Sequence, residues 1–272
     1  MDRNEWTLVV FTLLIQAATG LLLVAFTFSS WALFSEQTSS VELSSQAVIL
    51  AALLSLLGGG VAALHLANPK NGWRAFLNIK TSWLSREIFV TIIFTGVLIL
   101  GALTAIMTTL DLKSVTAVCG ISALLGLMTV CIMSKVYMVK TMPLWNSWTT
   151  PVEFVSSAIL LGLIQYLFIL AGHGGTVDIL ADENILLLLI MICVVVKLFV
   201  VQRPSMLQQG GNRTVSECCR ARLVLLLSAL LFLSAAFILD SFVALWVTGV
   251  LLLLSELKGR LNFFESVYKL GL

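Results

Sequence analysis

Apolar and polar positions follow one another along this chain in long blocks rather than residue by residue. Apolar runs cover residues 7–34, 45–67, 85–110, 114–139, 152–172, 184–202, 221–239 and 241–257, and short polar segments with turn residues separate them. A helix needs about 20 residues to cross ~30 Å of hydrocarbon, and most of these runs reach that length. The pattern therefore predicts an all-α, polytopic membrane bundle of about eight transmembrane helices.

The details of the runs agree with helices rather than strands. The segment "ENILLLLIMICVVVKLFV" is apolar on every face, whereas the strands of a membrane barrel alternate apolar and polar residues. Only "LDS" separates the last two runs, and the eighth is short for a straight crossing, so we expect a tight hairpin there. The first run is too long for the core of a signal peptide and is expected to remain as an anchor.

Composition supports the same class of protein. Of the 272 residues, 59% are hydrophobic and 11% are charged, which is more apolar surface than the core of one water-facing globule can bury. The sequence shows neither an internal repeat of 20–50 residues nor a low-complexity segment. We therefore expect one integral membrane domain over residues 1–272.

Basic residues are distributed very unevenly between the two ends of such a bundle. With eight spans, 15 of the 16 lysines and arginines fall on the face that holds both termini and the loops after the second, fourth and sixth spans, here called the basic face. Lys113 falls on the other. The positive-inside rule places the basic face in the cytoplasm. Alternatively, this face docks an acidic partner; the net charge of +2 gives no indication of nucleic-acid binding.

Cysteines and histidines give no sign of a metal centre. The five cysteines include no CxxC spacing, so neither an iron–sulfur cluster nor a zinc site is expected. His65 ends the second span on the basic face, whereas His173 follows the fifth span on the other. Two axial haem ligands must face each other at one depth, so we expect no haem and no metal site in this chain.

One histidine and one glutamate on the basic face are candidates for proton chemistry. His65 ends the second span and Glu87 opens the third. An imidazole titrates near neutral pH and can accept a proton from a bound hydroxyl, and a carboxylate at membrane depth is costly unless it serves a function. His65 alone is equally well explained as an ordinary interfacial side chain. The nearby Gly58–Gly60 permits either close helix packing, which is its more common use, or approach of a flat ligand.

Further polar and aromatic residues fall on the same face, each with an ordinary structural explanation. They are Gln16, Tyr137, Trp145, Trp148, Glu153, Glu256 and Arg260. Aromatic residues at this depth commonly form the interfacial belt, and Glu256 can pair with Arg260 across one helical turn. Arg74, Lys80 and Arg86 can anchor the interface by snorkelling instead of docking a partner.

The block "LHLANPKNGWRAFLNIKTSWLSREI" resembles the membrane anchor subunits of dimethyl sulfoxide reductases, the DmsC-like family, which is related more distantly to polysulfide reductase (NrfD-like) anchors. Shorter matches are "FTLLIQAATG", "KVY", "PLWNSWTTP" and "SELKGR". The resemblance covers nearly the whole chain, and the first block is the most specific.

This resemblance implies a haem-free anchor of eight helices in a prokaryotic cytoplasmic membrane. Such an anchor oxidises menaquinol to menaquinone in anaerobic respiration and passes electrons to a four-cluster iron–sulfur subunit. That subunit feeds a catalytic subunit with a molybdenum bis-molybdopterin-guanine-dinucleotide cofactor. His65 and Glu87 match the family's quinol-site histidine and glutamate. We expect a quinol site made of His65, Asn68, Arg74, Glu87, Tyr137 and Glu256, and partner docking through Lys70, Lys80, Arg86, Lys140 and Arg260.

Two other functions are alternatives to quinol oxidation. The bundle can be a tether without catalysis, or it can be a small-molecule transporter, although the sequence lacks the inverted repeat and the interrupted helices typical of transporters. Family members with exported catalytic subunits have the quinol-site face outside, whereas that face is the basic one here. The side on which the catalytic subunits dock, the terminal electron acceptor and the direction of quinone chemistry are therefore not determined by the sequence.

Overall fold

The structure is a bundle of long helices. The computed structural model describes residues 3–35, 40–64, 76–142, 145–173, 179–207, 213–239 and 242–269, and within these ranges it contains eight α-helices and no strand. They are α1 (Arg3–Ser35), α2 (Ser40–Leu64), α3 (Trp83–Met107), α4 (Leu112–Tyr137), α5 (Thr149–Gly172), α6 (Ile179–Leu207), α7 (Arg213–Leu239) and α8 (Phe242–Lys269). The predicted all-α bundle of about eight helices is confirmed.

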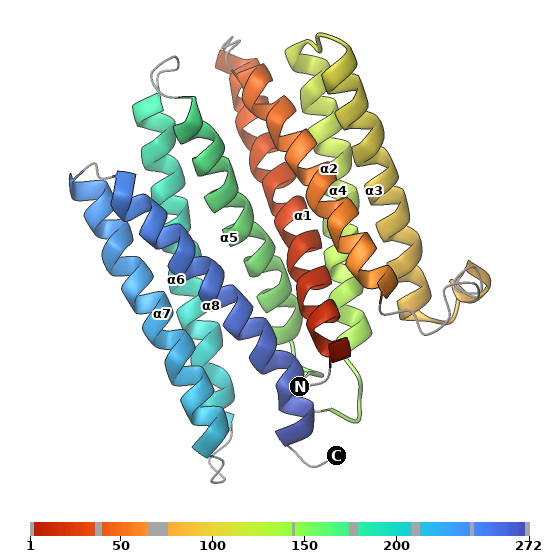
Figure 1. Ribbon diagram of the computed structural model, residues 1–272, viewed down its shortest axis with the longest axis vertical. Helices are drawn as coiled ribbons and strands as arrows, with labels where there is room; N and C mark the ends of the chain where they lie inside the picture. Colours follow the sequence, from red (N-terminus) through yellow and green to blue (C-terminus); the bar gives the residue numbers. More distant parts are fainter. Residues whose placement is uncertain are drawn as a thin grey trace.

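Helix α8 differs from the expected short final span. It continues well past the apolar run that ends at residue 257 and reaches Lys269. It can continue because Arg260, a charged residue just after the apolar run, turns into the bundle interior and finds a partner there. Helices α7 and α8 lie side by side in Figure 1, as the predicted hairpin requires.

The helices are suited to a membrane by length and composition. Within the described residues, α1 to α5 and α7 each contain an apolar stretch long enough to cross a bilayer, and α6 carries a shorter one at Asn184–Val200. Their outer surfaces carry exposed large apolar side chains such as Leu100, Phe199 and Leu231. The protein is a multi-pass membrane protein.

Two groups of four helices make up the bundle. Figure 1 shows α1 to α4 on one side and α5 to α8 on the other, with α1 and α5 between them. Helix α1 packs against α2, α4 and α5 and is the most buried of the spans. The basic face lies at the bottom of Figure 1, where both termini are found and where α3 and α5 begin.

Close backbone packing joins the two groups where α1 crosses α5. A Cβ atom added to Gly162 of α5 would lie only 2.6 Å from the Cα of Gly20 of α1 and closer still to its carbonyl group. A Cβ atom on Gly20 would in turn meet the backbone of Ala158. Small residues allow such close approach of membrane helices, whose association depends on van der Waals packing. The crossing fixes how the two halves are placed.

Candidate functional site

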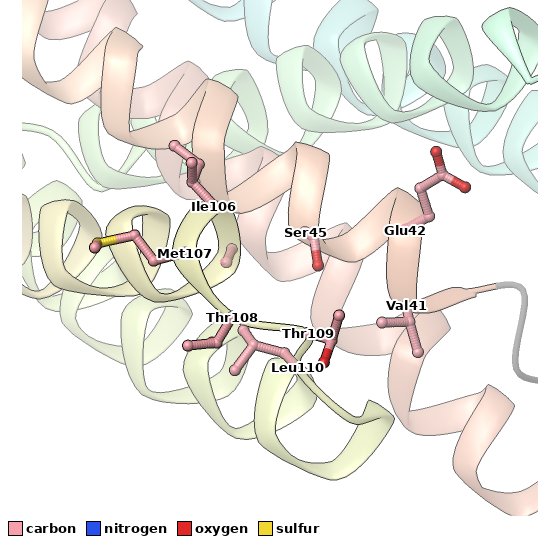
Figure 2. A pocket seen from close by; sticks show the side chains of 9 residues that line it. Val41, Glu42, Ser45, Ile106, Met107, Thr108, Thr109 and Leu110 are labelled. Atoms are coloured by element: carbon pink, nitrogen blue, oxygen red, sulfur yellow. The ribbon is translucent and has the colours of Figure 1, made fainter.

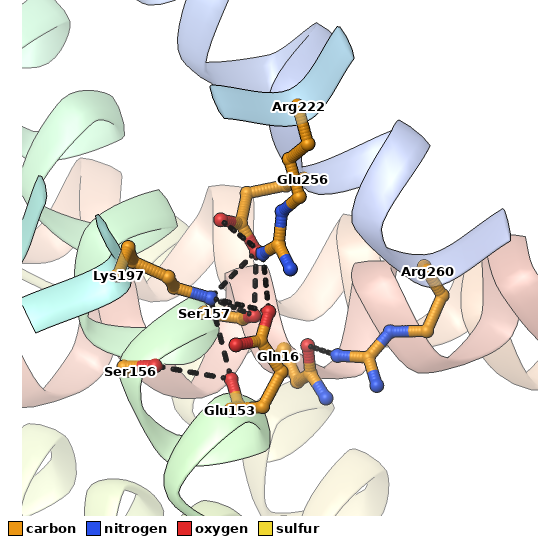
Figure 3. Close-up of polar contacts among 8 residues, drawn as sticks. All are labelled: Gln16, Glu153, Ser156, Ser157, Lys197, Arg222, Glu256 and Arg260. Carbon is orange, nitrogen blue, oxygen red and sulfur yellow. Dashed lines mark hydrogen bonds and ion pairs between the residues drawn. The ribbon is translucent and has the colours of Figure 1, made fainter. Parts of the chain in front are cut away.

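A buried network of charged side chains lies between α5, α6, α7 and α8 (Figure 3). At its centre is Lys197 of α6, whose side chain is 0% exposed. The Lys197 Nζ atom lies 3.1 Å from Glu153 Oε1 and 2.9 Å from Glu256 Oε2, and it donates a hydrogen bond to Ser157 Oγ at 2.6 Å. The Ser157 hydroxyl donates to the same Glu256 oxygen at 2.5 Å. One lysine therefore connects carboxylates from α5 and α8.

Arg222 of α7 is the second cation of this network. Its Nη2 atom pairs with Glu153 Oε1 and lies 3.5 Å from Glu256 Oε1. Space for the guanidinium exists because residue 259 of α8 is glycine: a Cβ atom there would lie 2.6 Å from Arg222 Nε. All four helices of this half thus contribute to one set of buried ion pairs, which are costly inside a membrane unless fully partnered.

Arg260 of α8 lies beside this network and contacts α1. It is 3% exposed, donates from Nη2 to Gln16 Oε1 at 2.7 Å, and stacks its guanidinium 3.9 Å from the centre of the Phe154 ring. The pairing with Glu256 that the spacing allows does not form, because Glu256 faces Lys197 and Arg222. Arg260 was expected to dock a partner; its place inside the bundle contradicts that role, since its charge is directed at Gln16.

Aromatic rings fill the space next to Arg260. The Tyr137 ring centre lies between 5.2 and 5.8 Å from those of Trp145, Phe154, Phe263 and Phe264. Trp145 stacks on Phe263 and donates its indole N–H to the Phe263 carbonyl at 3.0 Å. Tyr137 and Trp145 therefore pack inside the bundle, whereas Trp148 is exposed as a residue of the interfacial belt would be.

Glu87 lies in the second turn of α3, which begins after its N-cap residue, Ser82. The Ser82 hydroxyl accepts a hydrogen bond from the backbone N–H of Ser85 at 3.3 Å, which stabilises the helix start. Glu87 is 3% exposed, and its Oε1 atom has no hydrogen-bond partner among the described residues. Tyr137 lies within electrostatic range of both Glu87 and Arg260. The structure thus brings Glu87, Tyr137 and the network to the same region of the basic face.

The remaining predicted site residues divide into two groups. His65, Asn68, Lys70 and Arg74 lie outside the described residues, so their roles stay predictions. Lys80 and Lys140 are exposed near the basic face, as a docking role requires. Arg86 is partly buried; it donates to the carbonyls of Ile79 at 2.8 Å and Lys80 at 2.7 Å and stacks over Trp83, so it holds the segment that leads into α3.

The network changes the count of charges on the basic face. Lys197, Arg222 and Arg260 belong to the 15 basic residues assigned to that face, but all three are buried. Twelve remain, against Lys113 on the opposite face. The asymmetry is therefore weaker than the sequence suggests, although its direction is unchanged.

A second polar region lies at the opposite end of the bundle. An open hollow of about 510 Å³ lies between the start of α2 and the end of α3, lined among others by Glu42, Ser45 and Thr109 (Figure 2). Near it, His173 Nε2 lies 3.1 Å from Gln46 Nε2 and 3.6 Å from Glu42 Oε1. His173 is thus far from Glu87, as the spacing of the spans predicts. Across the described ranges, no three His, Cys, Asp or Glu side chains gather as metal ligands would.

The charged network was not predicted from the sequence, although the short blocks that resemble the family contain four residues that lie at or beside it. Gln16 lies in "FTLLIQAATG", Tyr137 ends "KVY", Trp145 lies in "PLWNSWTTP" and Arg260 ends "SELKGR". All four meet in this one region of the structure. Lys197 and Arg222 belong to none of these blocks, so no motif indicated them.

A comparison with known protein families covers nearly the whole chain. A family model described as "DMSO reductase anchor subunit (DmsC)" matches residues 1–265. The chain belongs to the DmsC family. It is 30% identical over 161 residues to a chain of the anaerobic dimethyl sulfoxide reductase of Haemophilus influenzae, and the match covers 58% of this protein and 56% of that relative.

Other relatives show a similar, partial overlap with this DmsC-family protein. It is 31% identical over 178 residues to a chain of the anaerobic dimethyl sulfoxide reductase of Escherichia coli, covering 63% of this protein and 60% of that relative. It is also 34% identical over 86 residues to a subunit of the sulfite dehydrogenase of Allochromatium vinosum, covering 31% and 26%. The aligned part therefore spans less than two thirds of the length of these relatives.

Proposed function

We propose that this DmsC-family protein binds menaquinol in the membrane, oxidises it, and passes the electrons to an iron–sulfur subunit. That subunit would supply a molybdopterin catalytic subunit in anaerobic respiration. Membership of the anchor family over residues 1–265 supports the role as an anchor, and the relatives in Haemophilus influenzae and Escherichia coli are chains of anaerobic dimethyl sulfoxide reductases. Quinol oxidation is the step that goes beyond family membership.

The observation that carries the proposal is the buried carboxylate of Glu87. Oxidation of one quinol releases two electrons and two protons, so the site needs a group that accepts protons from the quinol hydroxyls. The Glu87 Oε1 atom is buried and lacks a hydrogen-bond donor among the described residues, so it is available to a hydroxyl. His65 directly follows the last residue of α2 in the sequence and supplies the second proton acceptor.

In this mechanism, His65 accepts the proton of one quinol hydroxyl as the first electron leaves. Glu87 accepts the proton of the other hydroxyl as the second electron leaves, and both protons then pass to water by way of Glu87. Tyr137 contacts the Phe154 ring and lies within electrostatic range of both Glu87 and Arg260, and we assign it to the inner wall of the site. The two electrons leave through the basic face to a cluster of the docked iron–sulfur subunit. Quinol becomes quinone, and both protons are accounted for.

Docking would use the loops of the basic face in a prokaryotic cytoplasmic membrane, with that face and both termini in the cytoplasm. Lys80 and Lys140 are exposed there, and Lys70 precedes Lys80 in the sequence between α2 and α3. Exposed lysines suit a partner with acidic patches, because complementary charge accelerates and orients association. Arg86 contributes indirectly, by fixing the segment that carries Lys80.

The proposal is tested by titrating the purified complex with a menaquinol-site inhibitor whose fluorescence is quenched on binding. We expect one binding site per complex in the wild type and loss of binding in both His65→Ala and Glu87→Gln. Glu42→Gln is the matched control, because Glu42 is a carboxylate with a 72% exposed side chain at the opposite end of the bundle. Oxidation of a soluble menaquinol analogue is measured on the same samples.

The alternative function is a tether without catalysis, and the same experiment separates the two. If an assembled complex that carries both His65→Ala and Glu87→Gln still binds the inhibitor and oxidises quinol, the proposed site is refuted and the tether is the better account. The presence of all subunits is checked on a gel for each variant, so that loss of assembly is not mistaken for loss of quinol binding.

A further inference from the structure

The contact between Arg260 and Gln16 leaves hydrogen-bond donors without acceptors in the bundle interior. The Arg260 Nη2 atom donates to Gln16 Oε1, but Arg260 Nε, Arg260 Nη1 and Gln16 Nε2 have no partner among the described residues. Gln16 is 0% exposed and Arg260 is 3% exposed, so bulk water does not reach these atoms. Buried polar groups in proteins are almost always hydrogen-bonded, and an exception of three donors at one contact calls for an occupant.

The charges around Arg260 also point to a bound anion, because cations outnumber carboxylates there. The network contains three cations and two carboxylates, and Glu153 and Glu256 are each shared by Lys197 and Arg222. No described carboxylate lies within ion-pair distance of Arg260, and its partners are a neutral amide and the Phe154 ring. Glu153 and Glu256 act on Arg260 only from beyond ion-pair distance. A buried cation without a direct counter-charge is unfavourable in a membrane interior. The contact therefore lacks a direct counter-charge as well as hydrogen-bond acceptors.

The geometry limits which ligand can supply both the negative charge and the hydrogen-bond acceptors. The Phe154 ring covers one face of the guanidinium, so a ligand approaches its edge, where the N–H groups lie. Figure 3 shows the Gln16 amide nitrogen and the second terminal nitrogen of Arg260 on the same side of the bond that joins the two residues. Because these donors are sealed from solvent, the ligand is small.

We propose that a small monovalent anion of the halide type, such as chloride, binds between Arg260 and Gln16 and completes the interior network. A halide accepts hydrogen bonds without donating any and carries the missing charge. A water molecule would satisfy the donors but would bring two hydrogens of its own and no charge. The site goes beyond the proposed quinol chemistry and does not depend on it.

The experiment uses the full-length protein purified in detergent. It is exchanged from chloride into gluconate buffer of equal ionic strength, and halide is then added back while thermal unfolding is followed. We expect the unfolding temperature to rise with bromide or chloride, because a ligand that binds only the folded state stabilises it by mass action. Halide retained after exchange is released by unfolding and measured by ion chromatography, with about one equivalent per protein molecule expected.

Two variants that remove the site in different ways keep the test decisive. Gln16→Glu places a carboxylate beside Arg260, so it supplies the charge internally: the protein becomes more stable in gluconate, and the response to halide disappears. Arg260→Gln removes the charge and the guanidinium N–H groups, and it also abolishes the response. Lys113→Gln removes an exposed basic residue on the opposite face and is expected to respond like the wild type.

The outcomes separate the explanations. Retained halide with a halide-dependent unfolding temperature in the wild type, and neither in Gln16→Glu, supports the site. An unfolding temperature that is the same in gluconate and in halide, with no retained halide, overturns it in favour of buried water. A response that survives in Gln16→Glu also overturns it, because the halide then acts elsewhere on the protein.

Discussion

The crossing of α1 and α5 gives a prediction whose size follows from the backbone geometry. Gly162→Ala adds a methyl group that would lie 2.6 Å from Gly20 Cα, which is 0.8 Å short of an ordinary 3.4 Å contact. The atoms it meets belong to the backbone of α1, so no flexible group is free to move aside. The two helices must therefore separate by about 0.8 Å or more, and a gap of ~0.5–1 Å forfeits a quarter to a half of each van der Waals contact.

The expected cost combines two opposing terms. Overpacking costs up to about 3 kcal/mol, and replacing glycine by alanine in a helix returns about 1 kcal/mol, so we expect Gly162→Ala to lower the free energy of unfolding by about 2 kcal/mol. Gly96→Ala is the matched control, because a Cβ atom on Gly96 of α3 meets no heavy atom within 4 Å. It should leave stability unchanged or raise it by about 1 kcal/mol.

Unfolding of both variants is measured in mixed micelles with an increasing fraction of dodecyl sulfate, with helix content followed by circular dichroism. The difference between the two variants should be about 2–3 kcal/mol. Equal stability of Gly162→Ala and Gly96→Ala would refute the reasoning, since it would mean that the crossing does not limit the approach of the two halves.

Three further substitutions test the interior contacts by the same unfolding assay. Lys197→Met leaves two carboxylates without their central cation and is expected to cost about 3–5 kcal/mol; a loss below ~1 kcal/mol would show that the network contributes little. Gly259→Ala places a methyl group 2.6 Å from Arg222 Nε, and because the guanidinium can shift, we expect a loss of about 1 kcal/mol, with a neutral result counting against the steric account. Trp145→Phe removes the N–H that donates to the Phe263 carbonyl and should cost about 1 kcal/mol, whereas an unchanged transition would show that ring packing alone holds this contact.

The helices of this protein are largely predictable from its sequence, because hydrocarbon imposes one simple requirement. Each crossing needs a long apolar run with its backbone bonds satisfied internally, and such runs are visible without knowledge of any neighbour. The extension of α8 beyond its apolar run was not predicted in this way. Arg260 looks like a surface residue to any count of apolar positions, and only its contact with Gln16, 244 positions earlier in the sequence, explains why the helix continues.

The candidate site was predictable only in part, for a related reason. Glu87 is identified by a local block, and the structure places it in the interior with Tyr137 nearby. The partners of Glu256 are not local: Lys197 and Arg222 lie on two other helices, and spacing along α8 points to Arg260 instead. Sequence spacing identifies neighbours along one helix, whereas the network is made across four.

The three buried cations have a consequence for how the protein enters the membrane. Insertion is decided while helices emerge one after another, before α5 to α8 have packed, and positive charge then retains flanking segments on the cytoplasmic side. Before that packing, Lys197, Arg222 and Arg260 lack their interior partners and would count as retention signals. Packing of the last four helices later hides them among Glu153, Glu256 and Gln16. The same residues would thus act first as topogenic signals during synthesis and afterwards as interior ties of the finished protein.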